Sequence, residues 1–360
     1  MPRRDARTET RNETHAPQAD DMLVRVAWLY YVEEMTQAAI GDLLGLTRRA
    51  VNEMLGQARS AGLVNITINA KSRDCIEAEK ALERRYGLAA SRLVPTPQDP
   101  DGKTWAVLGQ AGASYLEGCL DRGEVSTLAV GWGNTLNALQ HVLALRGRKA
   151  NAPDKVNAPD KASRSDQDAA GDSAADGAGS GLVVKSIMGA LTTGHEITSF
   201  DIVRGFAHRL DATGHYFAAP IYSSSPQSRR TLLEQPEFRD PYARLCDADI
   251  ALVSVGGMSR QSLQIRHGIP AWVSAEELAA AGAVGDIIGR YLDSTGAELD
   301  HPINGCAMSP ELASFRKIPR RVVISGGRGK HQVMRAVAES GLATVLITDL
   351  DCARALLDQD

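Results

Sequence analysis

Apolar residues near the N-terminus recur at the spacing of helices that bury one face. The first run has them at i, i+3, i+4 and i+7, at Leu23, Val26, Ala27 and Tyr30. Thr36, a residue type that caps helices, begins a second short run, and Gly45 ends it. A third helical run begins after Thr47, and the alternating stretch LVNITI that follows it is typical of a strand. The pattern predicts a helix, a second helix, a tight turn, a third helix and a wing over residues 20–70.

Farther along the chain, short runs rich in Val, Ile and Ala alternate with helical patterns. These strand-like runs are STLAVG, LVVKSIMG, GHYFAAPI, DIALVSVGG, RRVVISGG and TVLITD. Continuous apolar strands separated by helices are typical of an α/β fold with a mainly parallel sheet. The amphipathic segment CIEAEKALERRYG precedes them, so we expect a linker helix at residues 71–90 and an α/β domain over residues 91–360.

Two segments lack any apolar period. Residues 1–19 alternate arginines with acids, and we expect them to form a flexible arm. Residues 148–181 are almost entirely Ala, Asp, Asn, Lys, Ser, Gly and Pro, and they contain the tandem NAPDKVNAPDK. Such a composition cannot bury enough apolar surface to offset the entropy of ordering. We therefore expect a disordered low-complexity insertion within the α/β domain.

Composition and charge narrow the classes of protein. A chain of 360 residues is expected to form more than one domain, and its net charge of −4 excludes a uniformly basic nucleic-acid-binding protein. The five cysteines lie at least 44 residues apart, a spacing that indicates neither a metal cluster nor a redox pair, and we expect no metal and no cofactor. No run approaches the ~20 apolar residues of a membrane span, and the N-terminus lacks a signal-like apolar region. We expect a cytoplasmic protein with no membrane partner.

The third predicted helix carries hydrogen-bonding side chains on one face. With Val51 taken as the buried reference, Arg49 and Asn52 fall on the polar face, and Arg48 and Arg59 flank it. Arginine can bind guanine with two hydrogen bonds and asparagine can do the same with adenine, so these four are candidate DNA-contacting residues. An ordinary three-helix subdomain with a solvated polar face remains the alternative, because residues 20–70 hold four arginines and no lysine against six acids.

Four strand ends continue into glycine-containing loops. They are Gly131–Thr135, Met188–Ala190, Gly256–Gly257 and Gly326–Lys330. In an open parallel sheet a ligand lies at the carboxyl ends of the strands, where glycine lets the backbone approach it. The first and last of these loops precede helical patterns, and a helix N-terminus favours an anion, most simply a phosphate.

None of these loops matches an enzyme motif. Leu136 occupies the position of the third glycine in a dinucleotide-binding fingerprint, and His331 follows Lys330 where a P-loop requires Ser or Thr. The sequence around Ser259 lacks the second glycine of a nucleophile elbow, and the eight histidines show no metal-binding spacing. We expect no catalytic residues and a pocket that binds phosphate and hydroxyl groups.

The motifs resemble those of one family. The stretch AWLYYVEEMTQAAIGDLLGLTRRAVNEMLGQARSAGLVNITI is similar to the DNA-binding segment of SorC/DeoR-type sugar-binding transcriptional regulators. The similarity continues through GWGNTL, ADIALVSVGG, GAVGDIIGRYLDSTG, ISGGRGKHQ and VLITDLDCARALL, and covers about residues 22–358 apart from the low-complexity segment. It implies a winged-helix-like helix-turn-helix domain, followed by a Rossmann-like effector domain that resembles sugar-phosphate isomerases and deaminases.

The resemblance also implies a function and a set of site residues. It implies a homodimeric or homotetrameric regulator that binds operator DNA and controls carbohydrate or polyol catabolism, for example of erythritol or sorbitol. The resemblance further implies that the effector is a sugar or polyol in phosphorylated form. The effector-binding positions carried over are Gly131, Gly133, Asn134, Thr135, Gly189, Thr198, Ser199, Asp286 and Lys330. In that assignment Asn134, Thr135 and the loop amides donate to phosphate, Lys330 neutralises it, and Asp286 accepts from sugar hydroxyls.

Several alternatives stay open at this point. An enzyme of the sugar-phosphate isomerase or deaminase type shares the effector domain's fold, and a metabolite-sensing scaffold could use the helical segment to bind protein. Asp286 could instead cap a helix, and Lys330 could be a solvated lysine at a helix start. Met188 and Ala190 stand where the family often has a second glycine and a polar or basic residue, which argues against a second phosphate on the effector.

Overall fold

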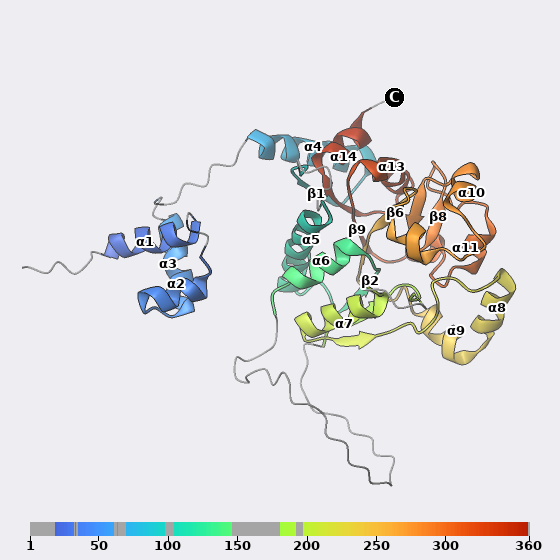
Figure 1. The fold of residues 1–360 in the computed structure, drawn as a ribbon, viewed down its shortest axis with the longest axis horizontal. Helices are drawn as coiled ribbons and strands as arrows, with labels where there is room; N and C mark the ends of the chain where they lie inside the picture. The colour runs from blue at the N-terminus through green and yellow to red at the C-terminus, as the bar shows by residue number, and fades with distance from the viewer. Residues whose placement is uncertain are drawn as a thin grey trace, which may run out of the picture. The chain divides into compact units, whose positions relative to one another are not determined.

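The computed structural model describes residues 19–31, 33, 35–60, 63, 70–97, 104–145, 181–191 and 197–358 (Figure 1). The chain forms two compact units, Met1–Asn69 and Ala70–Asp360. Apart from one residue each, the expected N-terminal arm, the expected wing at residues 63–68 and the expected insertion at residues 148–181 lie outside the described residues. Among the described residues, no helix combines the length and apolar character needed to cross a membrane.

The described part of the smaller unit contains three helices around a small apolar core. The helices are α1 (Ala19–Tyr31), α2 (Gln37–Leu44) and α3 (Arg48–Ser60). The fully buried core residues are Val26, Ile40, Val51 and Leu55. The side chain of Thr36 accepts a hydrogen bond from the backbone of Ala39 and so caps α2, while Gly45 ends α2 with a left-handed φ of 68°. Both helix ends fall where the sequence predicted them.

A tight turn joins α2 to α3. The backbone N–H of Leu46 donates to the carbonyl of Gly41 over 2.8 Å. A Cβ atom at position 41 would lie 2.6 Å from the carbonyl oxygen of Leu46, so only glycine permits the turn to come this close. The hydroxyl of Thr47 accepts from the N–H of Ala50 and begins α3. Helix-capping threonines and the close approach of the backbone at Gly41 therefore set the order of two helices, a turn and a third helix.

A seven-stranded parallel sheet organises the larger unit. Its strands, in spatial order, are β1 (Ala90–Val94), β10 (Val345–Asp349), β9 (Arg320–Ile324), β5 (Ile250–Val253), β2 (Thr127–Val130), β3 (Val183–Ser186) and β4 (Thr213–His215). Every pairing in this sheet is parallel. The prediction of an α/β fold with a mainly parallel sheet is confirmed, and each of the six strand-like runs overlaps a strand, although GHYFAAPI shares only Gly214 and His215 with β4.

A second sheet was not predicted. The run DIALVSVGG divides at Ser254 into β5 and a separate strand, β6 (Val255–Gly257). The strand β6 pairs antiparallel with β7 (Gly285–Ile287), which pairs antiparallel with β8 (Arg290–Leu292). The turn between β7 and β8 consists of Ile288 and Gly289, both with positive φ. An isoleucine at the first position of such a turn is unusual, so no hairpin signal is present in the sequence.

Helices cover both faces of the parallel sheet. The remaining helices are α4 (Ala70–Tyr86), α5 (Thr104–Asp121), α6 (Asn134–Val142), α7 (Ser199–Leu210), α8 (Pro226–Glu234), α9 (Pro236–Ala243), α10 (Ala275–Ala280), α11 (Pro302–Cys306), α12 (Leu312–Phe315), α13 (His331–Glu339) and α14 (Leu350–Leu357). Alternate residues of β5 enter two separate cores: Ile250 and Leu252 pack with α5, α6 and α7, whereas Ala251 and Val253 share a core with α4, α13 and α14. The strand β5 is thus buried on both sides, which explains its continuous apolar sequence.

Candidate functional site

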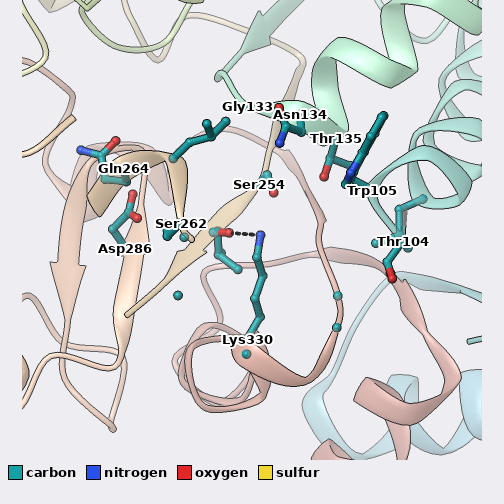
Figure 2. A pocket seen from close by; sticks show the side chains of 18 of the residues that line it. Thr104, Trp105, Gly133, Asn134, Thr135, Ser254, Ser262, Gln264, Asp286 and Lys330 are labelled. Atoms are coloured by element: carbon teal, nitrogen blue, oxygen red, sulfur yellow. Dashed lines mark hydrogen bonds between the residues drawn. The ribbon is translucent and has the colours of Figure 1, made fainter. Parts of the chain in front are cut away.

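A cavity of about 630 Å³ opens at the carboxyl ends of the central strands (Figure 2). Its walls include the loop after β2, the segment from β5 into β6, the loop after β9 and the end of β10. Three of the four glycine loops picked out in the sequence, Gly131–Thr135, Gly256–Gly257 and Gly326–Lys330, therefore face one space. This is the position at which open parallel sheets bind their ligands.

The loop after β2 leads into the N-terminus of α6. Gly133 precedes the helix with a φ of 123°, a conformation that favours glycine, and no side chain caps the helix there. Asn134 and the buried Thr135 form the first turn, and Figure 2 shows both at one end of the cavity beside Trp105. Gly131 also lines the cavity, although a Cβ at that position would make only ordinary contacts. The first-turn amides and the positive end of the helix dipole together suit an anion.

Lys330 lies at the start of α13, on the wall formed by the loop after β9. Its ammonium donates to the carbonyl oxygen of Val255 over 2.7 Å and to the hydroxyl of Ser325 over 3.1 Å. Burial lowers the pKa of Lys330, and the negative charge of Asp286 opposes that shift. The alternative of a solvated lysine at a helix start is wrong, because the side chain reaches inward to partners on β6 and after β9.

Asp286 lies in β7 with only 6% of its surface exposed. Its carboxylate accepts the backbone N–H of Gly289 over 3.1 Å, and the backbone of Gly256 also donates to it. Burial raises the pKa of Asp286 to about 6, against the lowering effect of these hydrogen bonds and of Lys330. A Cβ at Gly256 would overlap this carboxylate, so that glycine makes room for it. The helix-capping alternative for Asp286 is wrong, since the residue belongs to a strand that lines the cavity.

Of the fourth glycine loop, Met188–Ala190, Met188 lines this cavity, whereas Gly189 and Ala190 do not. A Cβ at Gly189 would overlap the carbonyl of Pro220, so this glycine lets two backbone segments cross. Thr198 and Asp201 form a capping box at the start of α7, and the hydroxyl of Ser199 donates to the carbonyl of Gly189 over 3.3 Å. Gly189, Thr198 and Ser199, which the family resemblance implies for the pocket, thus do not line the cavity in the described structure, where they cap and pack. Residues 192–196, between them, lie outside the described part of the chain.

Other lining residues were missed from the sequence. They include Thr96 after β1, Thr104 and Trp105 at the start of α5, and Ser254, Ser262 and Gln264 around β6. Trp105 has 39% of its surface exposed and stands at the same end of the cavity as Thr135 (Figure 2). These residues lie outside the glycine loops singled out in the sequence, and several of them lie at helix starts or in irregular turns. Tertiary proximity alone brings them to the site.

The candidate DNA-contacting side chains lie on the exposed face of α3. Arg48, Arg49 and Asn52 are exposed, and the opposite face buries Val51. Arg49 forms an ion pair with Glu53 over 2.9 Å. The amide oxygen of Asn52 accepts a hydrogen bond from Gln37 on α2 over 3.2 Å. The side chain of Arg59, the fourth candidate, lies outside the described residues.

Metal chemistry finds no support in the residues that the structure describes. Within them, no group of three or more His, Cys, Asp or Glu side chains could hold a metal ion. All five cysteines are described, and all are free thiols. The cavity instead combines a cation, a buried carboxyl and a helix N-terminus, which can bind a ligand carrying both negative charge and hydroxyl groups.

Three known proteins are similar to this chain over nearly its whole length. The erythritol catabolism regulatory protein EryD of Brucella abortus is 27% identical over 344 residues, which cover 95% of this chain and 98% of that protein. The transcriptional regulator LsrR of Escherichia coli K12 is 28% identical over 342 residues, with 94% and 95% covered. The fold matches the crystal structure of the full-length sorbitol operon regulator SorC from Klebsiella pneumoniae with a TM-score of 0.63, at 22% identity, over 94% of this chain and 98% of SorC.

These relatives define the class of protein as a sugar-responsive transcriptional regulator of the SorC/DeoR type, and not an enzyme. The chain belongs to the family described as "Putative sugar-binding domain", whose model matches residues 70–149 and 178–358. The family resemblance noted in the sequence is confirmed. The isomerase-like or deaminase-like enzyme alternative is set aside, because the matched relatives are regulators.

Proposed function

We propose that this regulator binds operator DNA through α3 and binds a phosphorylated sugar or polyol in the cavity at the ends of β2, β5 and β9. The single observation that carries the effector assignment is the convergence of Lys330, Asp286 and the uncapped N-terminus of α6 on one cavity. A phosphate needs donors and positive charge, whereas sugar hydroxyls need acceptors such as a carboxylate. One ligand that carries both groups satisfies both ends of the cavity.

The phosphate end would be formed by Gly133, Asn134, Thr135 and Lys330. The amides at the start of α6 point along the helix axis, so their dipoles add to the charge of the lysine. The Lys330 ammonium already donates to Val255 and Ser325, which holds it at the wall of the cavity before any ligand arrives. Preorganised donors of this kind favour binding because little side-chain entropy remains to be lost.

The DNA-binding role would fall to Arg48, Arg49 and Asn52. These side chains project from a helix whose opposite face is fixed to α1 and α2, so they could enter a major groove as a rigid set. A symmetric operator has two half-sites, and each binds one DNA-binding unit. The protein would therefore be at least a homodimer, and a homotetramer satisfies the same condition. The effector would regulate by binding one of two arrangements of the protein more tightly than the other. A protein of this function acts in the cytoplasm.

A thermal-shift screen of the full-length chain tests the effector assignment. The panel contains four- to six-carbon polyols and sugars, each in its free and its monophosphorylated form. A ligand at about 100 times its Kd adds about 2.7 kcal/mol to stability, so a true effector produces a clear rise in Tm. We expect the phosphorylated member of a pair to act at lower concentration than the free member. Equal effects of both forms would overturn the phosphate assignment.

A further inference from the structure

Trp105 is an aromatic residue of the cavity wall whose indole ring is only partly covered. It lies in the first turn of α5, lines the cavity and has 39% of its surface exposed. Its indole N–H forms no hydrogen bond with the residues that the structure describes, whereas the exposed Trp28 donates to Glu33 over 3.1 Å. A large apolar surface left open inside a cavity indicates a contact surface for a ligand.

Close helix packing fixes the position of Trp105. A Cβ at Gly109 would lie 2.8 Å from the backbone nitrogen of Leu139, so only glycine lets α5 approach α6 this closely. Leu108, one turn after Trp105, is buried and lies 3.2 Å from the position that a Cβ at Gly326 would take. The first two turns of α5 are therefore held against both α6 and the loop after β9. This packing places Trp105 next to the two glycine loops that form the phosphate end of the cavity.

Thr135 lies beside Trp105 and presents its hydroxyl to the same space (Figure 2). Only 5% of Thr135 is exposed, and within the described part of the chain its hydroxyl has no hydrogen-bond partner. The unpaired polar atoms that the fold encloses completely do not include this hydroxyl, so it is open to the cavity. Together with the uncapped amides of α6 and the ammonium of Lys330, it forms a set of donors for an oxyanion. Such donors bind the oxygens of a phosphate ester and of inorganic phosphate alike.

We propose that Trp105 is a specificity-determining residue: one face of its indole ring packs against the C–H groups next to the phosphate of the effector. Inorganic phosphate has no such groups and leaves the ring exposed to water. Burial of about 50–60 Å² of apolar surface corresponds to about tenfold in affinity, so the ring favours a phosphate ester by about that factor. The site thereby selects a phosphorylated metabolite over free phosphate. This inference rests on the proposed effector function of the same cavity.

The test compares Trp105→Ala with two control variants. Trp105→Phe keeps an aromatic face, and Trp272→Ala removes an exposed tryptophan that does not line the cavity. The probes are the sugar and polyol monophosphates of the thermal-shift screen and inorganic phosphate, each titrated by calorimetry into the full-length chain. The ester that the wild type prefers should bind Trp105→Ala about tenfold more weakly, whereas the affinity for inorganic phosphate stays unchanged. Trp105→Phe and Trp272→Ala should bind that ester within a factor of about three of the wild type.

Each outcome bears on a different statement. Equal weakening of the ester and of inorganic phosphate in Trp105→Ala would assign Trp105 a structural role and overturn the proposal. An unchanged ratio of the two affinities in Trp105→Ala, or a loss in Trp105→Phe as large as in Trp105→Ala, would overturn it as well and leave the phosphate assignment intact. The wild type needs no variant: equal affinity for esters and inorganic phosphate would refute the selection. No response to any sugar or polyol phosphate would overturn both this inference and the proposed function.

Discussion

Glu79 on α4 accepts a hydrogen bond over 2.7 Å from the backbone N–H of Leu93 on β1. One turn later, Glu83 accepts over 2.7 Å from the N–H of Ser91. Among the described residues, β1 is the last strand in its sheet and pairs with β10 alone, so these N–H groups lie on the open edge. Two glutamates of a helix thereby satisfy an edge strand, which would otherwise present free donors to another chain. The predicted linker helix is in this way attached to the larger unit.

This relationship predicts the effect of Glu83→Ala on stability. The variant would leave the backbone N–H of the fully buried Ser91 without its partner, at a cost of about 1–3 kcal/mol in the free energy of unfolding. The control is Glu77→Ala on the same helix, which removes only an exposed pair with Arg73 and should change stability by less than about 1 kcal/mol. Denaturant unfolding of both variants measures the difference. Equal effects would show that capping of the edge contributes no more than the exposed pair.

Lys330→Ala should selectively weaken binding of phosphorylated effectors. The variant loses one charge-assisted contact worth about 1.5–3 kcal/mol, so affinity should fall by one to two orders of magnitude. Lys330→Arg should retain part of the response because it keeps the charge without the compact ammonium. Calorimetry with the phosphorylated and free forms of the same ligand provides the measurement, with Lys317→Ala, an exposed lysine, as control. If Lys330→Ala keeps the wild-type preference for phosphate, the lysine does not bind it.

The raised pKa of Asp286 predicts that the free energy of unfolding depends on pH. Its pKa in the folded protein is raised to about 6, whereas an unfolded aspartate has a pKa of about 3.9. The folded state therefore favours the protonated carboxyl, and this contribution is complete below about pH 4 and lost as the pH rises through about 6. Relative to Asp286→Asn, the wild type should lose up to about 3 kcal/mol of stability between pH 4 and pH 7. Unfolding of both proteins at several pH values measures the difference, and a constant difference would contradict the prediction.

Effector binding should change with pH in the opposite direction. The ionised carboxyl of Asp286 is the stronger acceptor for ligand hydroxyls, so binding of an unphosphorylated polyol should strengthen as the pH rises through about 6. A free polyol is the proper probe, because a phosphate titrates in the same range. Calorimetry between pH 5 and pH 8 measures the effect. The Asp286→Asn variant should bind the same polyol with little pH dependence, and a slope equal to that of the wild type would assign the effect to another group.

Substitutions on α3 should separate DNA binding from effector binding. Arg49→Ala and Asn52→Ala should each weaken specific operator binding by about 1–3 kcal/mol while effector-induced thermal shifts stay unchanged. Glu53→Ala should not weaken binding, since it releases Arg49 from its ion pair. Fluorescence anisotropy with a duplex from the regulator's own promoter region measures all three. Wild-type affinity in both Arg49→Ala and Asn52→Ala would mean that another element contacts the bases.

The sequence by itself determined the local elements and three walls of the site. The apolar runs overlapped six strands of the parallel sheet, and the signal is clearest for β5 and β10, because strands buried on both faces carry a continuous apolar signal. Thr36 and Gly45 marked the ends of α2, and the loops around Gly133 and Lys330 led to the cavity, since caps and glycine turns depend on the nearest neighbours in the chain. The order of the motifs indicated the family.

Only the tertiary structure decided which of these loops meet. The strand β1 escaped prediction because its partners are β10, about 250 residues later, and the side chains of Glu79 and Glu83. Gly189 has the same local signature as the other loop glycines, yet it lies against Pro220 instead of the cavity. The buried hydroxyl of Tyr222 accepts from Gln264 and donates to the carbonyl of Gly289, and these three residues lie on separate segments of the chain. Local sequence records backbone conformation and burial, whereas the partners of a buried polar atom are set by segments that only folding brings together.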